Sequence, residues 1–254
     1  MTQLFHSLSE WRVFRKQNHF NHKTIGFAPT MGNLHDGHKS LFERSLNEND
    51  FTVTTLFVNP TQFNNQEDFK NYPKTFEKDF DLMKNTGVHY LILPTFEELY
   101  PDNFLYKIIE TNFSQMLCGK HRSGHFDGVL TVVMKYFQLI KPTRAYFGEK
   151  DYQQLHLIKG MVDAFFIDTE IIGCPTIRSE SNLALSSRNN RLSTEELKLA
   201  EIFPKILKQK KSCEKISEEL TQLGFVVDYI EEHFGRRFGA VHLGNVRLID
   251  NIEL

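Results

Sequence analysis

Short apolar runs rich in β-branched residues alternate with amphipathic segments along the first two thirds of the chain. Three runs have the length and composition of buried strands, at 24–30, 51–60 and 88–94. Two segments between them repeat apolar positions at helical spacing, at 38–49 and 72–87. Because parallel strands are joined by right-handed helical crossovers, this order predicts a doubly wound α/β sheet.

The same alternation continues to about residue 175 and then changes. Four further segments extend it, with helices predicted at 126–140 and 151–165 and strands at 144–148 and 169–175. From residue 193 onward, two helical segments precede three short β runs, at 225–231, 239–244 and 246–250. We therefore expect an α/β domain over residues 1–175 and a smaller α+β domain over residues 176–254.

The composition is that of an ordinary globular protein. The 254 residues include 30 Lys and Arg against 32 Asp and Glu, and 40% are hydrophobic. The longest basic run is KQKK, so a nucleic-acid partner is not supported. Three widely spaced cysteines, Cys118, Cys174 and Cys213, predict reduced thiols and a cytoplasmic location. Neither a signal-peptide core nor an apolar run of membrane length is present, so we expect no membrane partner.

The stretch FAPTMGNLHDGHKSLFERS places two histidines and two glycines where a predicted strand becomes a helix. Free backbone N–H groups at a helix start bind phosphate, and Gly32 and Gly37 allow a ligand to approach the backbone. His35 and His38 could add contacts to phosphate oxygens whose charge rises during nucleotidyl transfer. The alternative is an ordinary helix start with Asp36 as its cap and histidines on the surface.

Two more polar clusters follow predicted strands, where ligands of such sheets bind. In VNPTQF, Asn59 and Gln62 offer neutral amides to hydroxyls or carboxylates, although an Asn-Pro turn explains the same letters. In FGEKDYQQ, Lys150 could contact phosphate and Asp151 a ribose hydroxyl, with Gln154 in the same crevice. The alternative there is a capped turn held by a salt bridge.

Two loops complete the candidate chemistry. The loop ALSSRNNRLS carries Arg188, whose planar guanidinium can close over a triphosphate, although a domain linker would look similar. The segment LCGKHRSGHFDGVLTVV carries Arg122 and His125 before a predicted helix, as substrate contacts or as ordinary polar residues. No group of His, Cys or Asp has the spacing of a zinc site, so no metal ligands are predicted.

Taken together, these motifs resemble the pantothenate synthetases, the pantoate–β-alanine ligases. The resemblance runs through PTMGNLHDGHKSL, LFVNPTQF, EDFKNYPKT, GVHYLILP, MLCGKHRSGHFDGVLTVV, RAYFGEKDYQQL, LALSSRNNRLS and RLIDNI, in the order of the family. It implies a Rossmann-like ATP- and pantoate-binding domain, similar to nucleotidyltransferases and tRNA synthetases with a HIGH-type signature, and a C-terminal lid. The implied reaction activates pantoate with ATP as pantoyl adenylate, releasing pyrophosphate, and then joins it to β-alanine, releasing AMP. Mg²⁺ carried by the triphosphate and a homodimer are also implied.

The resemblance also implies roles for individual residues. His38, His35, Lys150 and Arg188 would be catalytic, with His38 as the family's proton donor or as a group that stabilises phosphate charge. The residues implied to bind ATP are Met31, Gly32, Asn33, Leu34, His35, Asp36, Gly37, His38, Gly148, Glu149, Lys150, Asp151, Ile177, Leu185, Ser186, Ser187 and Arg188. Those implied to bind pantoate or β-alanine are Gln62, Gln154, Asn59, Arg122 and His125.

The chain departs from the family pattern at two places. Ser181 and Asn182 stand where the family commonly has Asp-Gly, although Asn tolerates a left-handed turn. The segment from Tyr229 to the end is compact, so we expect a lid that lacks part of the family's C-terminal sheet. Two other functions fit some of the motifs. One is a different nucleotidyltransferase, which has no need of VNPTQF, and the other is a nucleotide-binding regulatory or scaffold protein without turnover.

Overall fold

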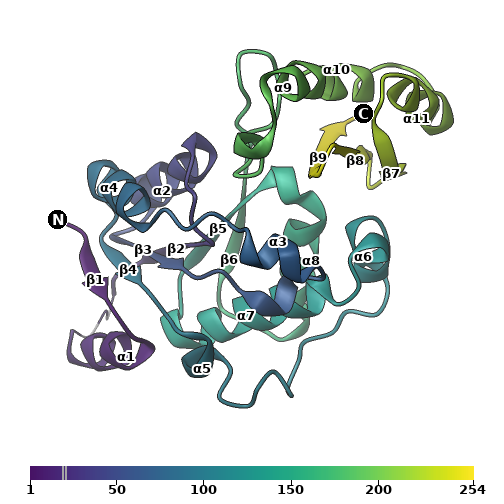
Figure 1. Ribbon diagram of the computed structural model, residues 1–254. Coiled ribbons are helices and arrows are strands. Elements are labelled where there is room, and N and C mark those ends of the chain that lie inside the picture. Colours follow the sequence, from purple (N-terminus) through teal and green to yellow (C-terminus); the bar gives the residue numbers. More distant parts are fainter. Residues whose placement is uncertain (19, 21) are drawn as a thin grey trace.

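A six-stranded parallel sheet forms the centre of the structure, a computed structural model that describes residues 1–18, 20 and 22–254 (Figure 1). Its strand order is β1-β4-β3-β2-β5-β6. The strands are β1 (Gln3–Phe5), β2 (Ile25–Thr30), β3 (Phe51–Leu56), β4 (Tyr90–Ile92), β5 (Arg144–Gly148) and β6 (Glu170–Cys174). The doubly wound parallel sheet predicted from the alternation is confirmed.

Successive side chains of the strands enter cores on opposite faces of the sheet. On β2, Phe27 belongs to a cluster with residues of α1 (Leu8–Gln17), α7 (His125–Ile140) and α8 (Tyr152–Ala164). Its neighbour Ala28 belongs to a second cluster, with residues of α2 (Asp36–Glu48) and α4 (Phe76–Thr86). Because both faces are covered, burial runs continuously along the strands rather than on alternate residues. In both β2 and β3, four consecutive residues are buried, and in β3 they include Thr52, Thr54 and Thr55.

Several elements differ from the sequence prediction. Strand β1 and helix α1 were not predicted, nor were the short helices α3 (Gln66–Lys70), α5 (Phe96–Leu99) and α6 (Cys118–His121). The strand predicted at 51–60 ends at Leu56, because the chain turns at Asn59 into the 3₁₀ segment η1 (Pro60–Gln62). The helix predicted from residue 72 begins at Phe76, and its predicted stop is confirmed, since Gly87 takes the left-handed conformation.

A smaller unit follows β6 and lies at the upper right of Figure 1, next to the start of α8. Its antiparallel sheet has the order β7-β8-β9. The elements are α9 (Thr194–Ala200), α10 (Phe203–Leu207), α11 (Cys213–Gln222), β7 (Val226–His233), β8 (Arg236–Leu243) and β9 (Val246–Glu253). Three helices stand where two were predicted, because the helical segment from 193 to 212 is interrupted before Pro204, which has no N–H to continue a helix.

The small sheet contributes side chains to two hydrophobic cores. Its residues Ile230, Val241 and Leu248 share a core with α9, α10 and α11, whereas Tyr229 and Phe238 belong to the core of the large sheet. The turn at residues 179–182 precedes this unit, and Asn182, with a φ of 71°, adopts the left-handed conformation that asparagine tolerates. Within the described residues, every helix is too short or too polar to traverse a lipid bilayer.

Candidate functional site

The candidate site lies at the carboxyl ends of β2 and β5. After β2 the chain adds strands on one side of the sheet, and after β5 it adds β6 on the other, so these neighbouring strands mark the switch point where such sheets bind ligands. A cavity of about 250 Å³ opens there. Among the residues that line it are Met31, His35, Gly37, His38, Asn59, Gln62, Arg122, His125, Gly148, Lys150, Asp151, Gln154, Ile177, Leu185, Ser186, Ser187 and Arg188. These predicted site residues come from distant parts of the sequence and therefore meet at one cavity only through the fold.

Five predicted nucleotide contacts are not among the residues that line this cavity, namely Gly32, Asn33, Leu34, Asp36 and Glu149. The first three belong to the turn that leads from β2 into α2, where they hold its shape. The side chain of Asp36 is exposed to solvent. The structure therefore brings most of the predicted residues to one cavity and leaves these five outside its lining.

Asp79 is the anchor of that turn, and the sequence analysis missed it. Its carboxylate is 2% exposed and accepts the backbone N–H of Asn33 at 2.9 Å and of Leu34 at 2.8 Å. Gly32 has a φ of +87°, and a Cβ at this position would lie 3.0 Å from the Asp79 carboxylate. Glycine is therefore required here by backbone conformation and by space. Only the tertiary fold brings α4 beside this turn, so no local signal pointed to Asp79.

The two histidines of the HDGH motif cap helix α2 together. The Gly37 N–H donates to His35 Nδ1 at 3.1 Å, and the His35 N–H donates to His38 Nδ1 at 3.3 Å. A Cβ on Gly37 would lie 2.8 Å from the His35 ring, which explains the glycine between them. The cap is His35 rather than Asp36. Of the backbone N–H groups expected to be free at this helix start, that of Gly37 is already bound by this cap.

This arrangement fixes the protonation of both rings. Burial, followed by the positive charge of Lys150, lowers the pKa of His35 to about 4. Burial, followed by His35 and Lys150, lowers the pKa of His38 to about 3. Both rings are therefore neutral at pH 7, and because each Nδ1 accepts a hydrogen bond, each proton sits on Nε2. Two imidazole N–H donors and one ammonium group thus lie together at the start of α2.

Asn59 holds the turn that carries Gln62. It is 2% exposed, and its amide donates to Gln62 Oε1 at 3.1 Å and to the Gly128 carbonyl oxygen at 3.2 Å. Its Oδ1 accepts from the hydroxyl groups of Thr61 at 3.0 Å and Tyr100 at 2.9 Å. These four bonds fill the amide's capacity, so the structure assigns Asn59 to positioning Gln62 rather than to direct substrate contact.

Arg122 and His125, where α6 ends and α7 begins, form a second unit that contacts the same turn. Arg122 Nη1 lies 3.0 Å from His125 Nε2, and His125 Nδ1 lies 2.8 Å from the Gln62 carbonyl oxygen. Because a guanidinium can only donate, Nε2 accepts and Nδ1–H donates to the carbonyl. Burial, followed by Arg122, lowers the pKa of His125 well below its usual range and keeps the ring neutral. Burial also lowers the pKa of Arg122 to about 10, which still leaves it charged at pH 7.

The loop at 184–193 closes one side of the cavity. The Arg188 guanidinium donates to Asp68 Oδ2 at 2.9 Å, and Arg191 donates to Asp68 Oδ1 at 2.8 Å. Burial alone would raise the Asp68 pKa, but the two arginines lower it overall. Asp68 lies on α3, an element that sequence reasoning missed, and it holds the loop through opposite charge.

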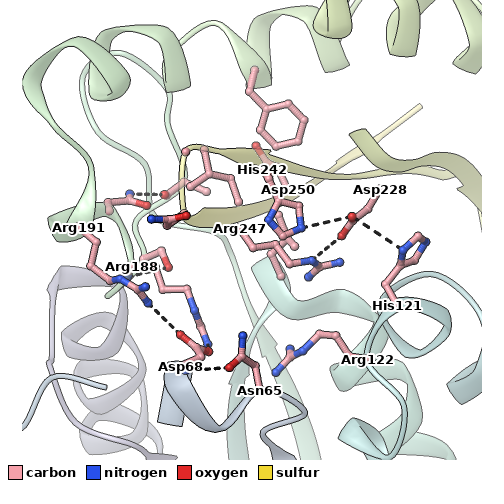
Figure 2. A pocket seen from close by; sticks show the side chains of 18 of the residues that line it. Asn65, Asp68, His121, Arg122, Arg188, Arg191, Asp228, His242, Arg247 and Asp250 are labelled. Carbon is pink, nitrogen blue, oxygen red and sulfur yellow. Dashed lines mark hydrogen bonds and ion pairs between the residues drawn. The ribbon is translucent and has the colours of Figure 1, made fainter. Parts of the chain in front are cut away.

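A larger cavity of about 580 Å³ continues from this loop into the space between the two units, and Figure 2 shows its charged lining. Asp228 on β7 accepts from Arg247 Nε at 2.7 Å, and lies 3.3 Å from His242 Nε2 and 3.8 Å from His121 Nδ1. Lys150 and Arg188 line both cavities, so the two spaces are joined at the predicted phosphate contacts.

The part of the chain that the structure describes contains no group of three or more His, Cys, Asp or Glu residues placed to hold a metal ion. The three cysteines are free thiols, with Cys118 and Cys174 buried. The polar side chains that line the smaller cavity supply imidazole, ammonium, guanidinium, amide, carboxylate and hydroxyl groups.

Known proteins resemble this chain over almost its whole length. A family model described as pantoate-beta-alanine ligase matches residues 3–253. A pantothenate synthetase of Legionella pneumophila (strain Lens) is 57% identical over 252 residues, which cover 99% of this chain and 100% of that protein. A pantothenate synthetase of Coxiella burnetii (strain Dugway 5J108-111) is 54% identical over 99% of this chain and 97% of that protein.

Solved structures agree in fold. A pantoate-beta-alanine ligase from Francisella tularensis, crystallised with beta-gamma ATP and beta-alanine, matches with a TM-score of 0.95 and 40% identity, over 100% of this chain and 98% of that one. A pantothenate synthetase from Thermus thermophilus matches with a TM-score of 0.88 and 37% identity, over 100% of this chain and 99% of that one. The expectation of a shortened lid is therefore wrong relative to these proteins. Sequence, fold and cavity agree that this chain belongs to the pantoate-beta-alanine ligase family.

Proposed function

We propose that this protein joins pantoate to β-alanine at the expense of ATP, through a pantoyl-adenylate intermediate. The observation that carries this proposal is the meeting of two kinds of chemistry in one cavity. Phosphate-binding donors from His35, His38 and Lys150 line the same space as the neutral amides of Gln62 and Gln154. A nucleotide and a small hydroxy acid can therefore be held within reach of each other.

ATP would lie across the switch point, with its phosphates between the start of α2 and the loop at 184–193. Lys150 and Arg188 both line the cavity and would provide positive charge for the triphosphate. Asp151 is half-buried in the same lining and is available for a ribose hydroxyl, and Ile177 supports contact with adenine through its backbone. One N–H of the Arg188 guanidinium donates to Asp68, and its other N–H groups would donate to phosphate oxygens.

In the first step, a carboxylate oxygen of pantoate attacks the α-phosphorus of ATP. A P–O bond forms to the carboxylate, and the bond from the α-phosphorus to the bridging oxygen breaks, releasing pyrophosphate. His38 is neutral in the free protein, so we assign its Nε2–H as a hydrogen-bond donor to the phosphate oxygens rather than as a cationic acid. Lys150 supplies the full positive charge beside it.

Pantoate would be held by Gln62 and Gln154 in the inner part of the cavity. Its hydroxyl and carboxylate groups match amide donors and acceptors, and neutral amides do not quench the nucleophilic carboxylate. Val129, Val132 and Val133 of α7 line the same cavity and offer an apolar surface for the two methyl groups of pantoate. Asn59 fixes Gln62 through the 3.1 Å bond between their amides.

In the second step, the amine of β-alanine attacks the acyl carbon of the adenylate. A C–N bond forms, the bond from the acyl carbon to the AMP oxygen breaks, and the amine releases a proton to water. Arg122 pairs with neutral groups, His125 Nε2 and the Gln62 carbonyl oxygen, and therefore keeps its positive charge for the carboxylate of β-alanine. Arg122 and His125 would therefore lie at the entry of the second substrate.

Mg²⁺, self-association and cellular location belong to the same proposal. The described residues build no cage of metal ligands, so Mg²⁺ would enter on the triphosphate oxygens, where it offsets phosphate charge. A homodimer and a cytoplasmic location follow from the family resemblance and from the reduced cysteines. Sedimentation of the purified protein at several concentrations measures its oligomeric state directly.

One assay tests the function. AMP and pyrophosphate release are measured with pantoate, β-alanine and ATP present, and again with each one left out in turn. We expect AMP and pantothenate only with all three, and pantoate-dependent exchange between ATP and pyrophosphate without β-alanine. A stable nucleotide adduct instead of AMP would favour another nucleotidyltransferase, and ATP binding without pyrophosphate formation would favour a regulatory protein.

A further inference from the structure

The side chain of Asn251 reaches from the small unit to the turn that carries Lys150. Asn251 lies on β9 and is 3% exposed. Its Nδ2 donates to the carbonyl oxygen of Glu149 at 2.9 Å and to that of Lys150 at 3.0 Å. These two carbonyls belong to the 3₁₀ segment η3 (Glu149–Asp151), which joins β5 to α8. A residue 101 positions away in sequence thus holds the backbone of the predicted ATP-binding turn.

The orientation of this amide is fixed by a third residue. Arg236 Nε donates to Asn251 Oδ1 at 2.8 Å, and a guanidinium cannot accept a hydrogen bond. The oxygen of the amide therefore faces Arg236, and both N–H groups of Nδ2 face the turn. The Arg236 guanidinium in turn lies 4.4 Å from the ring centre of Tyr152, the first residue of α8. The contact spans the whole junction between β5 and α8.

The neighbouring residue on β9 makes a parallel contact to a different segment. Asp250 is 3% exposed, and its carboxylate accepts hydrogen bonds from Arg178 Nη1 at 2.6 Å and Arg178 Nη2 at 2.8 Å. Arg178 directly follows Ile177, which lines the cavity. Consecutive residues of one strand of the small unit therefore hold two walls of the ATP-binding cavity.

Resting on the proposed function, we propose that Asn251 is a positioning residue for Lys150. Its two hydrogen bonds fix the position of the η3 backbone and thereby the position of the Lys150 ammonium group beside His35 and His38. Lys150 lowers the pKa of both histidines, so its charge lies close to their rings. The small unit then contributes to the first chemical step through the scaffold of the site, in addition to covering the cavity.

The isosteric change Asn251→Asp tests this role. It replaces the N–H donor with a carboxylate oxygen, which would face two carbonyl oxygens and push the turn away. The rate of pantoyl-adenylate formation is measured in single turnovers at saturating ATP and pantoate, and we expect it to fall about tenfold to a hundredfold. Ile252→Val is the matched control, because Ile252 is the next residue on β9, lies in the small unit's own core and should lower thermal stability without changing the rate.

A double-mutant cycle separates positioning from a merely structural role. In a Lys150→Ala background, Asn251→Asp should cost less than about twofold in the same rate, because the group it positions is gone. Equal losses with and without Lys150 would overturn the proposal, as would an unchanged rate in Asn251→Asp. If that variant fails to fold, Arg236→Gln provides the same comparison. It removes the guanidinium that fixes the orientation of the Asn251 amide and leaves Asn251 itself in place.

A second readout separates failure of this inference from failure of the proposed function. ATP affinity is measured by calorimetry for the same four proteins of the cycle, without pantoate. If the wild-type chain forms no adenylate, the proposed reaction is wrong, but the affinity cycle still decides whether Asn251 acts through Lys150. We expect Asn251→Asp to weaken ATP binding severalfold only when Lys150 is present, and an equal weakening in both backgrounds would overturn the proposal.

Discussion

Asn33 and Ser187 bind each other through two reciprocal hydrogen bonds. The Asn33 amide donates to the Ser187 carbonyl oxygen at 3.1 Å, and the Ser187 hydroxyl donates to the Asn33 carbonyl oxygen at 2.9 Å. The two residues are 154 positions apart, one in the turn after β2 and the other in the loop at 184–193. This pair joins the two loops that would grip the triphosphate from opposite sides.

Asn33→Ala should loosen that junction. The variant loses the amide bond and places alanine at a φ of 51°, which costs about 1–2 kcal/mol in the left-handed region. We expect a lower free energy of unfolding and a KM for ATP raised severalfold. Asn33→Gly is the matched control, because glycine accepts this φ freely and isolates the loss of the hydrogen bond. Equal KM values for wild type and both variants would contradict the role.

His38→Ala should reduce adenylate formation far more than stability. Removing a donor aimed at developing charge typically costs about a hundredfold to a thousandfold in rate. The measurement is pantoate-dependent exchange of pyrophosphate into ATP. His89→Ala serves as the control, since His89 accepts from the Thr52 N–H near the opposite, amino-terminal ends of β3 and β4. An exchange rate in His38→Ala equal to that of the control would rule out the assignment.

Gln62→Ala should raise the KM for pantoate by about tenfold, through loss of hydrogen bonds to a polar substrate, and leave the KM for ATP within about twofold. The backbone carbonyl that His125 binds is unchanged by this substitution. Gln62→Glu should weaken the binding of pantoate further, because the introduced carboxylate repels the carboxylate of the substrate. Parallel changes in the two KM values would count against the pantoate contact.

The free energy of unfolding should fall as the pH is lowered from about 6.5 to about 4. The pKa values of His35 and His38 in the folded protein are about 4 and about 3, below the ordinary value of 6.5. Between these limits the unfolded chain binds protons that the folded protein does not, so stability is fully present above pH 6.5 and lost below it. Urea denaturation at several pH values measures the slope. His38→Gln should flatten it, and an unaltered slope would exclude this source.

The sequence alone predicted the elements whose signals are local. The apolar and β-branched runs at β2, β3, β4, β5 and β6 are covered on both faces. The composition of such runs is enough to predict a strand. The turn motifs that follow them carried enough chemistry to predict phosphate and amide contacts. Tyr146 and Phe147, for example, are strand residues by composition alone, and the structure adds that they enter cores on opposite faces.

The tertiary structure decided which residue does what within those motifs. Asp79, Asp68 and Asn251 hold, from α4, α3 and β9, the three segments that we propose bind ATP, yet each is an ordinary polar residue in its own stretch of sequence. Likewise, the neutral state of His35 and His38 arises from burial and from Lys150. Hydrogen bonds and charge effects of this kind depend on distances between segments far apart in the chain, and those distances exist only once the sheet has brought the strand ends together.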